Sequence, residues 1–263
     1  ALLIGLNYTT TSNRLFGCIN DCLLIQNMLI NNFDFKPENI TFMRDDIYNS
    51  NSPLYPNKTN IISQIQNLIN KANNTGLKQL YIHYSGHGAN IRDTNGDESD
   101  GMDEFIVPMD YFSSYQRILD DELNSLFRSL NSNCQLFCVF DCCMSGTILD
   151  LPWNYSLEGS NFVQIQENRD NSLADKMNII CLSGCRDNEY ALDVNVNGVA
   201  NGALTLGIVN ILKQNNWVMN LKDLIINLYR YLTANNFNGQ RPLVSSNKRL
   251  DISTINYNFK QQP

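Results

Sequence analysis

Short apolar runs alternate along the chain with longer stretches in which apolar residues recur at every third or fourth position. The short runs are typical of buried strands, and they span residues 2–8, 40–46, 80–85, 136–141, 178–183 and 240–246. The longer stretches predict helices, and they span residues 18–29, 60–71, 120–130, 202–209 and 221–232. This alternation favours an α/β fold with a mostly parallel central β-sheet, right-handed crossovers and helices on both faces.

The 263 residues are expected to form a single domain, residues 1–263, since we find neither an internal repeat nor a second domain. Residues 105–111 are interpreted as an edge strand, because Pro108 cannot donate a hydrogen bond to an inner ladder. Residues 152–178 form the least patterned stretch, and we expect a mobile loop there.

Charge and composition narrow the classes of partner. The net charge of −7 and a pI near 4.8, with no basic stripe, argue against nucleic acid. No segment has the unbroken apolar length of a membrane span, so no membrane is expected either. The chain begins at Ala1 without a charged region, which is typical of a trimmed domain rather than a signal peptide. Several of the eight cysteines lie in apolar runs, which indicates reduced thiols and an intracellular, cytoplasmic location.

Two predicted strands end in residues whose side chains could act as a nucleophile or a base. The strand at 136–141 leads into the turn Cys142-Cys143-Met144-Ser145-Gly146, and the strand at 80–85 leads into Gly86-His87-Gly88. Ligands of open α/β sheets bind beyond the carboxyl ends of the strands, where a thiol is accessible to a neighbouring base. A cysteine and His87 could therefore form a nucleophile–base pair. His83 lies within its strand and is interpreted as a core histidine with a hydrogen-bond partner.

The stretch His83-Tyr84-Ser85-Gly86-His87-Gly88, followed by Asp141-Cys142-Cys143-Met144-Ser145-Gly146, resembles the metacaspases, which are caspase-like cysteine peptidases. The resemblance extends over nearly the whole chain and implies a caspase-like fold and a monomer. The family pattern Asp-x-Cys-x-Ser-Gly selects Cys143 as the nucleophile. Strand alternation agrees, because it puts Asp141 and Cys143 on one side. Met144 stands where the family commonly has His, but that His is not the base, so catalysis should survive.

The resemblance also implies a mechanism and a specificity. His87 would take the proton of Cys143, and the backbone N–H groups of Gly88 and Cys143 would stabilise the oxyanion. An acidic specificity pocket would select Arg or Lys at the residue before the cut in a protein or peptide substrate. By the same resemblance, the pocket-lining positions are Cys18, Asp21, Ser85 and Asp141. Helix capping is the competing interpretation of Asp21.

Carboxylates are dense after His87, and several of them near one point favour a hard divalent cation. In the metacaspases a calcium ion is held by aspartates, and the resemblance maps its ligands to Asp103, Asp120, Asp121 and Asp150. Helix capping accounts for Asp120 or Asp121 singly, but not for the whole set. Calcium would act as an activator that orders the acidic loop, and not as a Lewis acid.

The sequence therefore predicts a calcium-dependent cysteine endopeptidase that cleaves after Arg or Lys through Cys143 and His87. Arg169 and Lys176, in the expected loop, would be candidate self-cleavage points. The alternative is a catalytically silent homologue that acts as a binding or scaffold protein, and the intact Cys143 and His87 count against it. A phosphate-binding protein is disfavoured because no Gly-rich phosphate loop is present. A true caspase is disfavoured because the pocket positions are acidic.

Overall fold

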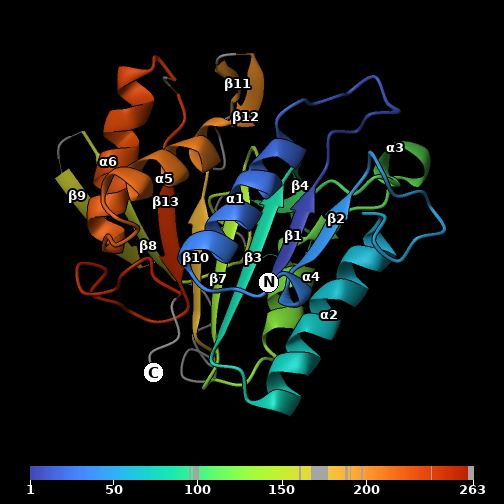
Figure 1. Cartoon of the computed structure of the whole chain (residues 1–263), viewed down its shortest axis with the longest axis horizontal. Helices are drawn as coiled ribbons and strands as arrows, with labels where there is room; N and C mark the ends of the chain where they lie inside the picture. The colour runs from blue at the N-terminus through green and yellow to red at the C-terminus, as the bar shows by residue number, and fades with distance from the viewer. Residues whose placement is uncertain are drawn as a thin grey trace.

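The computed structural model describes residues 1–259, apart from residues 95, 97–100, 160, 167–176, 187, 188, 190, 197 and 238. Within these residues an eight-stranded sheet forms the centre of the molecule (Figure 1). Its first five strands in spatial order are parallel: β2 (Thr41–Arg44), β1 (Leu2–Gly5), β3 (Gln79–Ser85), β7 (Gln135–Asp141) and β10 (Ile179–Ser183). Three antiparallel strands continue the sheet: β13 (Leu243–Ser246), β8 (Trp153–Glu158) and β9 (Asn161–Gln166).

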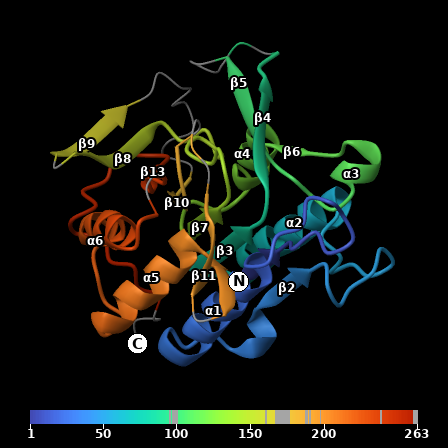
Figure 2. The ribbon, with the colours of Figure 1, turned by 90° about the horizontal axis from the view of Figure 1, so that it is seen from above.

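Helices cover both faces of this sheet, as the sequence predicted (Figure 2). One face packs against α1 (Cys18–Asn32), α5 (Ala203–Gln214) and α6 (Leu221–Ala234). The other packs against α2 (Lys58–Thr75) and α4 (Asp120–Phe127). The pleat explains the two cores, because Ile82 of β3 enters the second core while its neighbour Tyr81 enters the first. The expected mostly parallel α/β architecture is confirmed.

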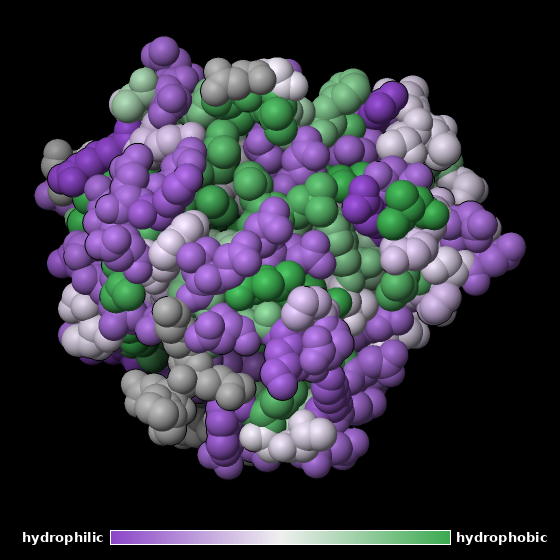
Figure 3. All heavy atoms as spheres, viewed as in Figure 1, coloured by the Kyte–Doolittle hydropathy of each residue, from purple (hydrophilic) through white to green (hydrophobic). Residues whose placement is uncertain are grey.

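The surface on the side of α1 and α5 carries no continuous apolar patch. Figure 3 shows green apolar residues interspersed among purple polar ones over this side of the molecule. Scattered apolar residues of this kind are normal on a protein surface. Among the helices of the described chain, none combines the length and the apolar character needed to cross a lipid bilayer.

Two smaller sheets lie outside the central one. One consists of β4 (Gly88–Arg92), β5 (Met102–Ile106) and β6 (Ile118–Leu119), with β5 in the middle. The expected edge strand at residues 105–111 is therefore wrong: the strand ends before Pro108, which removes the conflict between proline and an inner position. The other is the hairpin of β11 (Asp193–Val196) and β12 (Val199–Gly202), at the top of Figure 1. Two short helices, η1 (Pro37–Asn39) and α3 (Tyr111–Ser114), complete the elements.

The expected mobile loop at residues 152–178 is wrong over its first half. Residues 153–158 and 161–166 form the antiparallel strands β8 and β9, which extend the central sheet. Tyr155 is buried opposite Val244 of β13, and its ring stacks on Phe162 at 6.5 Å between centroids. Arg169 and Lys176 lie outside the described residues.

Candidate active site

The strand register brings the Cys143 turn and the His87 turn to the same edge of the sheet. β3 and β7 are parallel neighbours, and their last paired residues are Ser85 and Asp141. His87 and Cys143 each follow two residues later, so both leave the sheet side by side. A Cβ atom on Gly88 would lie 2.1 Å from the carbonyl oxygen of Cys143, so the two turns touch through their backbones. Both predicted catalytic residues therefore lie at the carboxyl ends of adjacent strands.

His87 is held by two residues of the loop that follows β1, Tyr8 and Asn13. Its Nε2 donates to the carbonyl oxygen of Asn13 at 2.7 Å, because a carbonyl can only accept. In the neutral ring, Nδ1 then carries the lone pair that can act as a base. Tyr8 accepts the backbone N–H of His87 at 2.8 Å, and the two rings lie 4.6 Å apart. Burial lowers the pKa of His87, and the Asn13 carbonyl opposes this in part.

The thiol of Cys143 is half-buried and lies against the chain at Ala191. Its Sγ accepts the backbone N–H of Ala191 at 3.3 Å and lies 3.8 Å from the carbonyl oxygen of the same residue. Burial raises the pKa of Cys143, while the Ala191 N–H acts in the opposite direction. The raised thiol pKa and the lowered imidazole pKa both favour the neutral forms of Cys143 and His87.

The turn that carries Cys143 is fixed by hydrogen bonds to its backbone. Cys142 is almost fully buried, so its thiol is far less accessible than that of Cys143. The carbonyl oxygen of Cys142 accepts from Ser145 Oγ at 2.9 Å and from Cys185 Sγ at 3.2 Å. Met144 has a left-handed backbone (φ 49°), and its N–H donates to the carbonyl oxygen of Glu189 at 3.2 Å. These contacts hold a non-glycine residue in a conformation that it rarely adopts.

Three of the four predicted pocket residues meet beside this turn. Asp21 Oδ2 accepts from the hydroxyl of Ser85 at 2.7 Å, and both side chains are buried. Asp141 is also buried, and a Cβ atom on Gly202 would touch a carboxylate oxygen of both Asp21 and Asp141. Cys18 is the first residue of α1, about one helical turn before Asp21, and is buried as well. The sequence-based alternative that Asp21 caps this helix is wrong, because the N-cap is Gly17.

Burial raises the pKa of Asp21, and the neighbouring Asp141 raises it further. Hydrogen bonds from Ser85, Gly202 and Asn201 act in the opposite direction. Two buried carboxylates next to each other bind a proton tightly when no cation lies between them, since both cannot easily be ionised.

The four predicted calcium ligands lie on neighbouring elements. The antiparallel register of β5 and β6 pairs Phe105 with Leu119, and just beyond it Asp120 Oδ2 accepts the backbone N–H of Glu104, the neighbour of Asp103, at 2.6 Å. Asp150 follows Leu149, whose carbonyl oxygen accepts from Asn124 of α4 at 2.7 Å. Carboxylate oxygens suit calcium, so the donor chemistry fits.

The arrangement of the four aspartate side chains supports a calcium site less than their chemistry does. In the part of the chain that the structure describes, no three or more His, Cys, Asp or Glu side chains are grouped so as to hold a metal ion. The aspartates are therefore brought to one region without forming a ready ligand set, and the calcium site stays a prediction.

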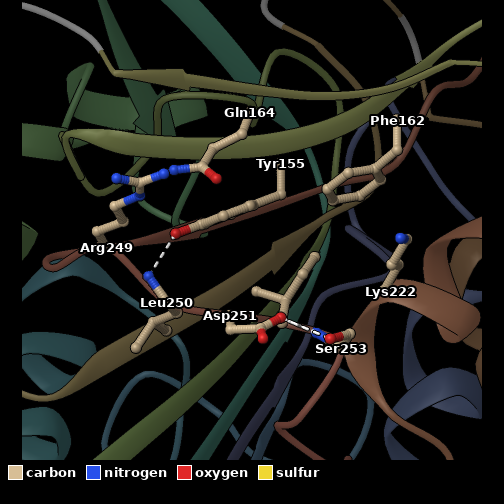
Figure 4. A pocket seen from close by; sticks show the side chains of 9 residues that line it. Tyr155, Phe162, Gln164, Lys222, Arg249, Leu250, Asp251 and Ser253 are labelled. Carbon is tan, nitrogen blue, oxygen red and sulfur yellow. Dashed lines mark hydrogen bonds between the residues drawn. The ribbon is translucent and has the colours of Figure 1, made fainter.

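A cavity of about 500 Å³ lies away from these residues, between the β8–β9 hairpin and the segment 249–253 (Figure 4). Tyr155 accepts the backbone N–H of Leu250 at 2.7 Å on its wall, and Arg249 and Lys222 lie at its sides. Its lining includes neither Cys143 nor His87, so it is not the catalytic cleft.

Several residues of the site were not foreseen from the sequence. Asn13 and Ala191 act through backbone atoms, which leave no trace in the choice of side chain. Tyr8 follows the first strand at the same sheet edge as His87, so its position could have indicated a role. Thr205 binds Asp141 from a helix far along the chain, which only the folded structure reveals.

Comparison with known proteins agrees with this site and fold. A family model described as the metacaspase, peptidase C14 domain matches residues 1–152. Metacaspase-1 of Schizosaccharomyces pombe is 32% identical over 96% of this chain and 68% of that protein. Metacaspase-1 of Cryptococcus neoformans is 41% identical over 60% of this chain, but over only 34% of its own length. This chain therefore corresponds to part of these longer relatives.

The fold also matches a solved caspase. The crystal structure of caspase-1 from Spodoptera frugiperda superposes with a TM-score of 0.58, covering 99% of this chain and 89% of that one at 10% identity. At this identity the likeness establishes the caspase-like fold alone. Fold and sequence together define a domain of the caspase-like cysteine-peptidase class. Within that class, the chain belongs to the metacaspase family.

Proposed function

We propose that the chain is a calcium-activated cysteine endopeptidase that cleaves proteins after Arg or Lys. Cys143 is the nucleophile and His87 the general base. The main support is the parallel register of β3 and β7, which puts both residues at one sheet edge next to the buried Asp21 and Asp141.

The reaction begins from a neutral thiol and a neutral imidazole. His87 Nδ1 takes the proton of Cys143 as Sγ attacks the scissile carbonyl carbon and forms a carbon–sulfur bond. The backbone N–H groups of Gly88 and Cys143 stabilise the resulting oxyanion. When the carbon–nitrogen bond breaks, His87 gives the proton to the leaving amine. Water, deprotonated by His87, then hydrolyses the thioester and restores the thiol.

Asp21 and Asp141 supply the specificity. A guanidinium or ammonium group that enters between them replaces the proton bound by the acidic pair and pairs with both carboxylates. An acidic substrate side chain would be repelled by the same charges. Ser85 holds Asp21 by its hydroxyl, and Cys18 lies one helical turn away on the pocket wall.

Calcium is proposed as an activator on the basis of the family and of the carboxylates on β5, α4 and the segment after the Cys143 turn. Asp103, Asp120, Asp121 and Asp150 would hold it. Calcium neutralises mutual repulsion among carboxylates and so orders the segments that carry them. The chemical steps at Cys143 do not pass through the ion.

The same reasoning extends to the setting of the enzyme. Its partners are proteins with exposed Arg or Lys residues, and we propose a monomer with an intracellular, cytoplasmic location. All eight cysteines are free thiols in the structure, which agrees with a reducing compartment.

Hydrolysis of two fluorogenic peptides, one ending in Arg and one in Asp, tests the proposal. Each is measured with millimolar calcium and with a chelator, on wild type, Cys143→Ala and the neighbouring Cys142→Ala. We expect cleavage of the Arg peptide only with calcium, its loss by at least about a thousandfold in Cys143→Ala, and its retention in Cys142→Ala.

Other outcomes separate the parts of the proposal. Cleavage of the Asp peptide would overturn the acidic pocket, and equal rates in chelator would overturn the calcium requirement. No cleavage of either peptide by a folded wild type would favour the silent binding protein.

A further inference from the structure

We infer that Thr205, at the start of α5, is a positioning residue that sets the specificity pocket by fixing the carboxylate of Asp141. The inference rests on the proposed function of Asp21 and Asp141 as the acidic pocket, and it concerns a residue on a third element.

Thr205 binds one oxygen of Asp141 twice. Its backbone N–H donates to Asp141 Oδ2 at 2.9 Å, and its hydroxyl donates to the same oxygen at 2.7 Å. Thr205 is fully buried, so no water competes for these contacts. Hydrogen bonds to an ionised acceptor are short and strong in such surroundings.

His83 lies against the Thr205 hydroxyl. Its Nε2 lies 3.5 Å from Thr205 Oγ1, and burial lowers the pKa of His83 to about 3, so the ring is neutral. Because the hydroxyl donates its proton to Asp141, its lone pairs remain to accept from His83. The hydroxyl therefore has Asp141 as its acceptor at 2.7 Å and His83 on its other side.

The residues just before Thr205 hold the other carboxylate. Gly202 N–H donates to Asp21 Oδ1 at 2.8 Å, and Asn201 Nδ2 lies 3.3 Å from the same oxygen. A Cβ atom on Gly202 would lie 2.2 Å from Asp141 Oδ2 and 2.9 Å from Asp21 Oδ2. One segment, residues 201–205, thus binds two carboxylates that come from α1 and β7.

The helix that begins here adds a favourable field, since the N-terminus of a helix stabilises negative charge. Asp141 interacts electrostatically with Asp21 and Cys22 from α1 and with Cys142 and Cys143 beyond β7, and His83 of β3 lies against the Thr205 hydroxyl. Thr205 therefore lets Asp141 meet a cation in its ionised form and in one orientation. Removing the hydroxyl takes away one of the two hydrogen bonds by which Thr205 fixes Asp141 Oδ2.

Two substitutions of similar size separate positioning from simple packing. Thr205→Val keeps the shape and removes the hydroxyl, while Thr205→Ser keeps the hydroxyl and removes a methyl group. With calcium present, we expect Thr205→Val to raise KM for Arg and Lys peptides by about tenfold or more, with kcat changed by less than about threefold. Thr205→Ser should stay close to wild type, and so should Thr233→Val, whose side chain is exposed on the outer side of α6.

A second measurement checks that Thr205→Val does not alter the reactivity of Cys143 itself. The alkylation rate of Cys143 by iodoacetamide, a reagent without a basic group, should be the same in wild type and Thr205→Val. If Thr205→Val does not fold by its thermal transition, Thr205→Ala is measured in its place.

The inference is overturned if KM is unchanged in Thr205→Val, or if Thr205→Ser is impaired as strongly as Thr205→Val. It is also overturned if kcat falls and KM does not. These results leave wild-type cleavage intact, whereas failure of the proposed function appears as a wild type that does not cleave basic peptides.

Discussion

The carbonyl oxygen of Cys143 occupies the space that a side chain on Gly88 would need. The distance from this oxygen to the ideal Cβ position is 2.1 Å, far inside any van der Waals contact. The obstacle is backbone, which cannot turn aside as a long side chain can. The turns that carry the nucleophile and the base can therefore approach each other this closely only because residue 88 has no Cβ atom.

Gly88→Ala should separate these turns and lower kcat/KM for an Arg peptide by about a hundredfold or more, because small misplacements of reacting groups are costly. The control is Ala89→Ser, on the next residue of β4, which should retain activity. Steady-state kinetics on both variants decides the matter, and near-normal activity in Gly88→Ala would contradict the contact.

Asp21→Asn should make the protein more stable and less active. The pKa of Asp21 is raised by burial and by Asp141, so its folded form binds a proton more tightly than its unfolded form. Its contribution to stability is then present at pH values below the ordinary value of 3.8 and is lost as pH rises through the folded pKa.

At neutral pH the uncharged Asn avoids this loss, and we expect a midpoint of thermal unfolding about 3 °C higher. The gain should vanish in acid, where Asp21 is itself protonated. A lower midpoint at neutral pH than in wild type would show that the Asp21 carboxylate does not destabilise the folded state. Cleavage of Arg peptides should fall at the same time.

Alkylation of Cys143 by iodoacetamide should speed up steadily with pH. The pKa of Cys143 lies above its ordinary 9.0 and that of His87 below its ordinary 6.5, both because of burial. His87 is therefore able to accept a proton above its folded pKa and loses this ability as pH falls through it. A plateau of fast alkylation between about pH 5 and 8 would instead indicate a thiolate–imidazolium pair.

Glu189 supports the wall of the Cys143 turn. Its carboxylate accepts the backbone N–H of Arg241 at 3.0 Å and of Arg186 at 3.2 Å, while its carbonyl oxygen accepts from Met144. Glu189→Ala should leave the backbone N–H groups of Arg186 and Arg241 without their carboxylate acceptor and lower kcat/KM by about tenfold. Glu189→Gln keeps an acceptor oxygen and should lose less. Equal activity in the two variants would exclude this role.

Much of the catalytic edge could be predicted from the sequence, because the strands before His87 and Cys143 are continuous apolar runs. Such runs are typical of inner parallel strands, and each ends at a residue that breaks the pattern. The direction of the chain then places both chemical groups at one edge. The family motif distinguishes Cys143 from Cys142, and the burial of Cys142 agrees with that choice.

The missed parts have other physical causes. The β8–β9 hairpin lies at the edge of the sheet, so only alternate positions such as Tyr155 need to be apolar, and its sequence resembles a loop. The hydrogen bond from Thr205 to Asp141 connects residues 64 positions apart, and nothing in the local sequence of either segment indicates it. Backbone contacts such as that of Asn13 with His87 depend on loop geometry, which side-chain patterns do not encode.

The place of β13 in the sheet also governs the order in which the chain can assemble. β13 comes last in sequence, yet it lies between β10 and β8. The β8–β9 hairpin therefore has no place in the sheet until residues 243–246 have been synthesised. Pairings over such sequence distances form late in folding. A ribosome-bound chain that already carries Cys143 and His87 would still lack its completed scaffold, which delays proteolytic competence until synthesis has passed β13.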